Sequence, residues 1–261
     1  MKRLVVNADD FGFTCDVNRG IIEAHRNGIL TATTLMATGE AFEDAVELAR
    51  ANPSLDVGGH VVLVGSPGLP RTIPQLVRAI ALGRIRVYEE IAAQVRRIVD
   101  AGLKLTHLDT HKHTHLLPPV LDALARVSAD FGIPWVRRPF DFPIHPRPAG
   151  LVKRAVSASF SLLRARFERE LGRRGCRSTD HFAGFQLTGN YDSAELAALI
   201  RALPDGSTEF MCHPGFCGNE LRGAETRLKE SRERELRALV SPAVRAALGE
   251  ARVELVSYRE L

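Results

Sequence analysis

Side chains that bind metal ions or transfer protons occur at five places along the chain, each at or directly after a strand-like run. Two adjacent carboxylates, an imidazole, a His-rich stretch, an arginine and a last imidazole follow in that order. Because the carboxyl ends of parallel strands meet at one edge of a sheet or barrel, we expect these side chains to lie close together. They are Asp9, Asp10, His60, His107, Asp109, His111, Arg137 and His213.

The neighbouring Asp9 and Asp10 predict a metal site if both side chains enter one pocket. Two carboxylates at such a distance repel each other, and a cation removes that repulsion. One carboxylate then ligates the metal, and the other holds the metal-bound water as a general base. The same pair is compatible with one Asp that caps a turn and another that faces solvent.

The stretch from His107 to His115 is the richest in potential ligands. The two-residue period of a strand places His107, Asp109 and His111 on one face, while His113 and His115 fall in the loop beyond. Imidazole suits zinc and similar cations, and catalytic sites use about three protein ligands, so the remaining histidines would orient the ligands. A polar strand end without a metal is the alternative.

Three further side chains each allow two interpretations. His60 fits a ligand because the preceding glycines permit close approach, and it also fits a hydrogen-bonded core histidine. His213 precedes a Pro-Gly turn that would project it from a strand end as a ligand or a general acid. Arg137 fits a group that binds a sugar hydroxyl or an oxyanion, and it also fits an ordinary surface ion pair.

Short strand-like runs alternate with longer helical patterns along the 261 residues. The predicted strands cover residues 3–9, 30–36, 55–63, 105–110, 135–138, 180–185, 209–212 and 252–257. The predicted helices cover residues 16–26, 42–51, 75–82, 88–101, 120–131, 150–174, 193–203 and 225–239. This alternation predicts an α/β fold with a parallel sheet, either a closed or distorted barrel or an open doubly wound sheet. No GxGxxG motif follows the first strand, which argues against a dinucleotide site.

The composition is that of an ordinary globular chain, with 45% hydrophobic and 25% charged residues and a net charge of +4. These values exclude disordered, fibrous and membrane-spanning classes, and so mild a charge does not favour nucleic-acid binding. We expect no signal peptide, no transmembrane segment and four reduced cysteines, and hence a cytoplasmic protein. The Leu- and Arg-rich segment 151–174 is compatible with peripheral membrane contact, but we favour a barrel helix with a solvated Arg face.

Together the motifs resemble those of the YdjC-like carbohydrate deacetylases, which include chitooligosaccharide deacetylases and the deacetylase of hopanoid biosynthesis. The resemblance implies a distorted (β/α) TIM-like barrel, with residues 1–261 as a single domain, and metal-dependent removal of acetyl from an acetamido sugar. The motifs occur in family order from residue 5 to about 216. They are Asn7-Ala8-Asp9-Asp10-Phe11-Gly12, Gly58-Gly59-His60, the stretch 106–115, Val136-Arg137-Arg138-Pro139 and Cys212-His213-Pro214-Gly215.

The resemblance also implies a role for each matching residue and one divalent cation, zinc or magnesium. Gly59, where the family often carries a larger residue, and a short loop after the third strand leave the type of substrate open, chitooligosaccharide or glycolipid. The implied roles are metal ligands at Asp10, His60 and His111, the base at Asp9, the acid at His213 and a substrate contact at Arg137.

Two other functions remain open from the sequence. A barrel with a His- and Asp-bound metal also supports sugar isomerisation or aldol cleavage, although these reactions usually need a second metal or a lysine, and only Lys112 lies near a strand end. A non-catalytic sugar-binding or metal-binding protein is the other alternative. A homodimer is compatible with each of these functions.

Overall fold

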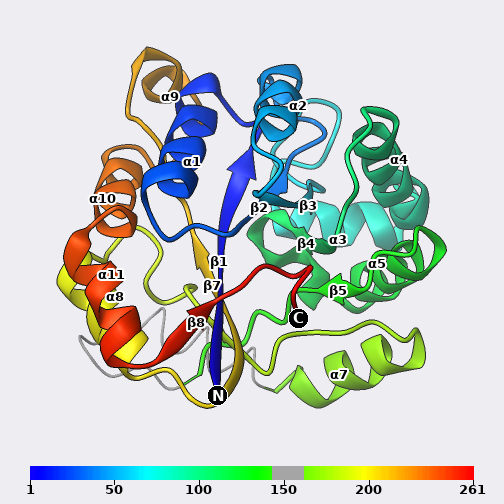
Figure 1. The fold of residues 1–261 in the computed structure, drawn as a ribbon. Helices are drawn as coiled ribbons and strands as arrows, with labels where there is room; N and C mark the ends of the chain where they lie inside the picture. Colours follow the sequence, from blue (N-terminus) through cyan, green and yellow to red (C-terminus); the bar gives the residue numbers. More distant parts are fainter. Residues whose placement is uncertain (143–161) are drawn as a thin grey trace.

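The computed structural model describes residues 1–142 and 162–261, and Figure 1 shows how its elements are arranged. The first part of the helix predicted over residues 150–174 lies outside the described residues, and its last part is α7. The strands are β1 (Lys2–Phe11), β2 (Ala32–Leu35), β3 (Asp56–Val61), β4 (His107–Thr110), β5 (Trp135–Val136), β6 (His181–Ala183), β7 (Gly206–Cys212) and β8 (Val253–Leu255). The α-helices are α1 (Cys15–Asn27), α2 (Phe42–Ala51), α3 (Ile73–Ala81), α4 (Val87–Asp100), α5 (Pro118–Asp130), α7 (Arg164–Arg173), α8 (Ser193–Arg201), α9 (Asn219–Gly223), α10 (Glu230–Leu239) and α11 (Pro242–Glu250).

The strands form one parallel sheet in the order β5-β4-β3-β2-β1-β7-β6, and β8 also pairs with β1. In Figure 1, β1 rises through the centre of the view from the N-terminus, with helices around the strands. Strand β7 pairs with β1 from Lys2 to Ala8, so β2 and β8 must share the opposite edge of β1. Strand β8 takes the lower part of that edge, at Lys2–Leu4, and β2 the upper part.

The two ends of this strand order approach each other, so the sheet curls into a distorted barrel. Isolated parallel bridges join Trp135 of β5 to Arg177, and Asp141 to Phe182 of β6. These bridges replace the continuous ladder that would close a regular barrel. The predicted α/β fold, a distorted (β/α) TIM-like barrel, is confirmed.

The alternation of side chains along β1 explains why the two faces of this strand differ in polarity. Leu4, Val6 and Ala8 belong to the main apolar core, whereas Val5 belongs to a separate small cluster with the C-terminal Tyr258. Successive side chains of a strand point to opposite faces, so residues 5, 7 and 9 share the face opposite to that core. The polar interior of the barrel begins with Asn7 and Asp9, both of which are buried.

The structure differs from the predicted elements in three places. The helix predicted over residues 225–239 is α10 alone, and the separate short helix α9 precedes it. Helix α11 was not predicted. Strand β4 ends at Thr110, so His111 begins a 3₁₀ turn, η1 (His111–Leu116), instead of extending the strand. Among the described residues, no helix is sufficiently long and apolar to cross a membrane.

Candidate active site

An irregularity at the end of β1 directs two consecutive carboxylates into one site. In a regular strand Asp9 and Asp10 would point to opposite faces. The pairing register between β1 and β2 shifts between Ala8 and Phe11, and Asp10 has a left-handed backbone with φ of 68°. Few non-glycine residues adopt this conformation, and those that do are frequent at functional sites. Both carboxylates consequently lie near His60, which forms one compact group with Asp10 and another with Asp9.

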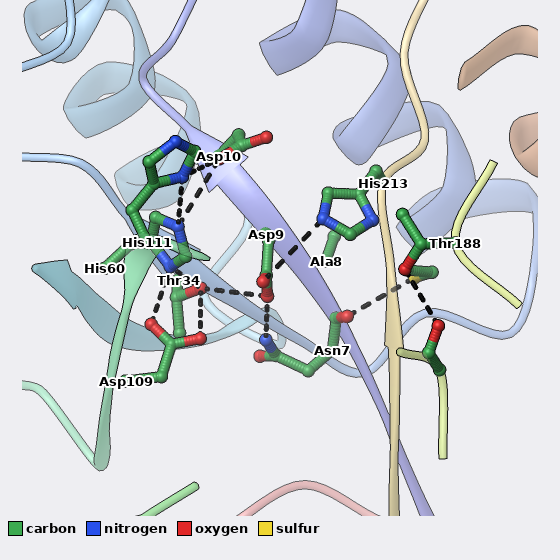
Figure 2. Close-up of polar contacts among 12 residues, drawn as sticks. Asn7, Ala8, Asp9, Asp10, Thr34, His60, Asp109, His111, Thr188 and His213 are labelled. Atoms are coloured by element: carbon green, nitrogen blue, oxygen red, sulfur yellow. Dashed lines mark hydrogen bonds and ion pairs between the residues drawn. The ribbon is translucent and has the colours of Figure 1, made fainter. Parts of the chain in front are cut away.

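Asp10, His60 and His111 form a compact triangle of potential ligand atoms (Figure 2). Asp10 Oδ1 lies 3.4 Å from His60 Nε2 and 3.4 Å from His111 Nδ1, and the two nitrogens lie 3.3 Å apart. The three residues come from the ends of β1 and β3 and from the start of η1. The structure thus brings together the three residues that the resemblance to the family implied as ligands.

The dimensions of this triangle fit a divalent cation. In a tetrahedral zinc site the distance from the metal to a nitrogen or oxygen ligand is about 2.1 Å. Two neighbouring ligand atoms are then about 3.4 Å apart. Asp10 Oδ1 is buried and has no hydrogen-bond partner among the described residues, which is costly unless a cation or another group satisfies it. A second group, Asp9, His60 and Asp109, is equally compact, but the guanidinium of Arg137 already lies between its two carboxylates.

Asp109 orients the imidazole of His60. A carboxylate can only accept a hydrogen bond, so His60 Nδ1 donates to Asp109 Oδ1 over 2.6 Å, and His60 Nε2 faces Asp10 and His111. Burial opposes a charge on this ring, but the carboxylates of Asp109, Asp10 and Asp9 outweigh it and raise the pKa of His60 to about 10. His60 would hold a cation only in its neutral form, which leaves a lone pair on Nε2.

Asp9 occupies the barrel interior next to this triangle. Arg137 donates to both of its oxygens, over 2.6 and 2.8 Å, and Asn7 Nδ2 donates to Oδ1 over 3.1 Å. Burial would raise the pKa of Asp9, but Arg137, His60 and His213 outweigh it and hold the pKa well below its usual range. The carboxylate is thus ionised and held in one orientation.

Arg137 is itself buried and lies among three carboxylates. Its side chain contacts Asp9, Asp109 and Glu209, the last through Nε over 2.7 Å, and the residue is 2% exposed. The substrate contact that the resemblance implied for Arg137 stays a prediction, and the contacts of its guanidinium lie with these carboxylates inside the barrel. Burial raises the pKa of Glu209 to about 7, although Arg137 opposes this rise.

His213 follows β7 and faces Asp9 from the side opposite to the metal triangle (Figure 2). Its Nε2 lies 3.9 Å from Asp9 Oδ2, and its Nδ1 has no hydrogen-bond partner among the described residues. Burial lowers the pKa of His213, and the charges of Asp9 and Glu235 only partly offset this effect. A mostly neutral imidazole beside an ionised carboxylate is able to exchange protons with a bound ligand.

His107 lies deeper in the barrel and contacts no member of the triangle. Its Nε2 lies 2.9 Å from Asn7 Oδ1, and its Nδ1 lies 2.8 Å from Thr106 Oγ1. The ring of His107 fits because residue 58 is a glycine. A Cβ at this position would lie 2.6 Å from ring atoms of His107. The glycine before Gly59-His60 therefore accommodates a neighbouring side chain, where the sequence suggested room for a ligand.

His113 and His115 point away from the metal triangle. Two consecutive left-handed residues, Lys112 and His113, turn the chain, so that His113 packs near Phe182 and His115 near Phe167. Burial and nearby positive charge lower the pKa of His113 well below its usual range and that of His115 to about 3. Both histidines are neutral and belong to the packing behind the site.

Helix α10 contributes two charged residues that the sequence analysis missed. Arg232 Nη2 donates to Asp10 Oδ2 over 2.5 Å, and Glu235 accepts a hydrogen bond from the backbone N–H of His213 over 2.6 Å. Each residue is 1% exposed. The available signal was their position, because residues 232, 235, 236 and 239 form the i, i+3, i+4, i+7 stripe that a helix buries.

Comparisons with known proteins show what this chain is similar to. A family model described as "YdjC-like protein" matches residues 3–250. The chain is 31% identical to a carbohydrate deacetylase of Brevibacillus brevis, over 99% of both chains. A crystal structure of an Enterococcus faecalis protein described as a cellobiose-phosphate cleavage protein has a TM-score of 0.73 and 26% identity, over 99% of this chain and 98% of that one. A lactam utilization protein of Thermus thermophilus, with a TM-score of 0.50 and 18% identity over 98% and 99% of the two chains, shares the fold.

Proposed function

The chain belongs to the family of YdjC-like proteins, and from this membership we propose that it is a carbohydrate deacetylase. In this proposal it hydrolyses the acetamide of an N-acetylated amino sugar to acetate and a free amine. The 31% identity with a carbohydrate deacetylase, over nearly the whole of both chains, supports the reaction class. The substrate is an acetylated chitooligosaccharide or an N-acetylglucosaminyl glycolipid.

One divalent cation is the proposed cofactor, and Asp10, His60 and His111 would hold it. When bound, such a cation polarises the acetamide carbonyl and lowers the pKa of a water molecule toward ~7. A donor set of one carboxylate and two imidazoles favours zinc over magnesium, which prefers an all-oxygen shell. The observation that carries the proposal is the triangle of ligand atoms 3.3–3.4 Å apart, one of which is a buried Asp10 oxygen with no hydrogen-bond partner among the described residues.

Asp9 and His213 are the proposed proton-transfer groups. Asp9 accepts the proton of the attacking water, whose oxygen bonds to the carbonyl carbon. The ring of His213 is mostly neutral, and its Nε2 lies 3.9 Å from Asp9 Oδ2, so it takes up the proton that Asp9 accepted from the water. His213 then donates this proton to the sugar nitrogen as the C–N bond breaks, so that the amine leaves uncharged. Arg137 is a positioning residue here, because its two hydrogen bonds fix both oxygens of Asp9.

Acetate release from a panel of acetamido sugars, combined with metal analysis of the purified protein, tests this function. The panel contains chitooligosaccharides of increasing length and an N-acetylglucosaminyl lipid, which separates the two substrate types. Asp9→Asn should retain the metal and lose about 10²- to 10⁴-fold in kcat. Near-wild-type turnover by this variant would exclude Asp9 as the base, and carbonyl products in place of acetate would identify an isomerase or aldolase.

Three features of the sequence interpretation remain proposals. We propose that residues 1–261 form a single domain, which is supported by the pairing of the last strand, β8, with the first, β1. We also propose a cytoplasmic location and a homodimer.

A further inference from the structure

Helix α10 is highly charged, yet it buries two charges on the side that faces the active site. Arg232 and Glu235 are 1% exposed and one helical turn apart, whereas Arg234 and Arg237 on the same helix are exposed. Burial of a charged side chain is costly unless other groups compensate it. The groups that compensate these two charges therefore indicate what the helix does.

Arg232 compensates one oxygen of Asp10. Its Nη2 donates to Asp10 Oδ2 over 2.5 Å, while Asp10 Oδ1 faces the two imidazoles of the triangle. The stem of Arg232 is confined, because Gly215 packs so closely that a Cβ at residue 215 would lie 3.2 Å from Arg232 Cδ. Arg232 thus fixes which oxygen of Asp10 is presented to a cation.

Glu235 accepts hydrogen bonds from groups around His213. Its Oε2 accepts from the backbone N–H of His213 over 2.6 Å and from the Tyr191 hydroxyl over 3.1 Å, and its Oε1 accepts from the backbone N–H of Gly189 over 2.7 Å. Within residues 1–142 and 162–261, Glu235 forms no ion pair with a basic side chain. A buried carboxylate held mainly by backbone donors fixes the chain from which the imidazole of His213 extends.

We propose that α10 positions both halves of the active site. Arg232 holds the metal ligand Asp10, and Glu235 holds the proton donor His213. The proposal rests on the proposed deacetylase function. It makes both residues positioning residues, and it predicts that they affect different measurable quantities.

Arg232→Met should weaken the affinity of the metal-free protein for Zn²⁺ by about 10- to 100-fold, as loss of groups that orient metal ligands does in other proteins. Affinity is measured by competition with a chromophoric chelator. Saturating Zn²⁺ should restore kcat to within about threefold of wild type, because the chemistry of the other residues is intact. Arg234→Met is the matched control, with the same change at an exposed position of the same helix.

Glu235→Gln should retain the Zn²⁺ affinity and KM, and lose about 100-fold in kcat, because a small displacement of a proton donor is sufficient for such a loss. Glu230→Gln is the control at an exposed position of α10. If Arg232→Met or Glu235→Gln does not fold, as judged by circular dichroism, Arg232→Lys and Glu235→Asp take their places with smaller expected losses of about tenfold.

Unchanged or tighter Zn²⁺ binding by the folded Arg232 variants would overturn the role of Arg232. Unchanged kcat, or a loss of Zn²⁺ affinity, in the folded Glu235 variants would overturn the role of Glu235. Failure of the proposed function is distinguishable, because wild-type protein would then release no acetate while the Zn²⁺ measurement on the Arg232 variants still gives an answer.

Discussion

Asp9 and Asp10 are adjacent in the chain, but one lies in the barrel interior and the other at its rim. Both carboxylates pair with a buried arginine, Arg137 and Arg232 respectively. Arg137 contacts both oxygens of Asp9, and Asn7 adds a further hydrogen bond, whereas Arg232 contacts only one oxygen of Asp10. The difference between the two sites is therefore the number of oxygen lone pairs that remain available.

This difference separates two kinds of chemistry. A carboxylate oxygen without a hydrogen bond, beside two imidazoles, is suited to a cation. A carboxylate held by several donors is ionised and oriented, because each donor stabilises its charged form, and it has little capacity for a metal. The neighbouring residues therefore give two identical side chains different properties. The local backbone irregularity at Asp10 directs the two side chains to these different surroundings.

The largest effect should follow from Asp10→Asn. This change removes the charged ligand of the triangle, and a catalytic cation contributes several kcal/mol of transition-state stabilisation, so activity should fall by about 10⁴-fold. Zinc content after dialysis, measured by atomic absorption, should fall with it. Retention of a full equivalent of zinc in Asp10→Asn, or its loss in Asp9→Asn, would reverse the assignment of the two carboxylates.

The next largest effect concerns the arginine of the interior. Arg137→Met leaves Asp9, Asp109 and Glu209 without their shared cation, and removal of one partner of a buried ion pair typically costs about 3–5 kcal/mol. Urea unfolding at pH 7, in the presence of EDTA, measures this loss. Arg138→Met, at the next residue, removes a more exposed ion pair with Glu168 and should cost about 1 kcal/mol or less. Equal losses for the two variants would show that the interior cluster does not depend on Arg137.

Glu209 gives a smaller effect that depends on pH. Its pKa is about 7 in the folded protein, above its ordinary value, so the folded state binds this proton more tightly than the unfolded state does. The associated stability is fully present below about pH 4.5 and is lost as pH rises through about 7. Between pH 5 and 8, unfolding of metal-free wild type should therefore become easier by up to about 3 kcal/mol relative to Glu209→Gln. Parallel stability curves for the two proteins would contradict the raised pKa.

The region of the metal triangle could be predicted from sequence, whereas its supports could not. Asp10, His60 and His111 lie at or just after strand ends, and parallel strands bring their carboxyl ends together whatever the details of packing. The choice of these three among the candidate residues came from the resemblance to the family. Arg232 reaches the site from a helix more than 200 residues after Asp10, and no strand-end rule places it there. The sequence does show that Arg232 is a charged residue within the apolar stripe of α10. This position predicts that Arg232 is buried, but it does not predict that Asp10 is its partner.

The fold shows the same division between local and distant information. Strand and helix positions follow from patterns within about ten residues, and most were predicted to within a few residues. The pairing of β8 with β1, and the burial of Arg137 in the barrel, depend on how the sheet curls. Strand β5 has two residues, so Arg137 lies just beyond it, and only the curl of the sheet brings its guanidinium against Asp9.

Asn7 offers the most sensitive test of how Asp9 is held. Its amide donates to Asp9 Oδ1, while its own oxygen lies 2.9 Å from His107 Nε2, so the imidazole fixes which way the amide points. Arg137 already contacts both oxygens of Asp9, and we therefore expect Asn7→Ala to lower kcat only about tenfold, about the value of one hydrogen bond to a charged group. Zinc affinity should not change, since of the two carboxylates the Asn7 side chain contacts Asp9 and not the proposed ligand Asp10. A loss of kcat as large as that of Asp9→Asn would mean that the amide of Asn7, and not the guanidinium of Arg137, determines the orientation of Asp9. A change in zinc affinity would mean that the interior and the rim of the barrel are coupled through β1.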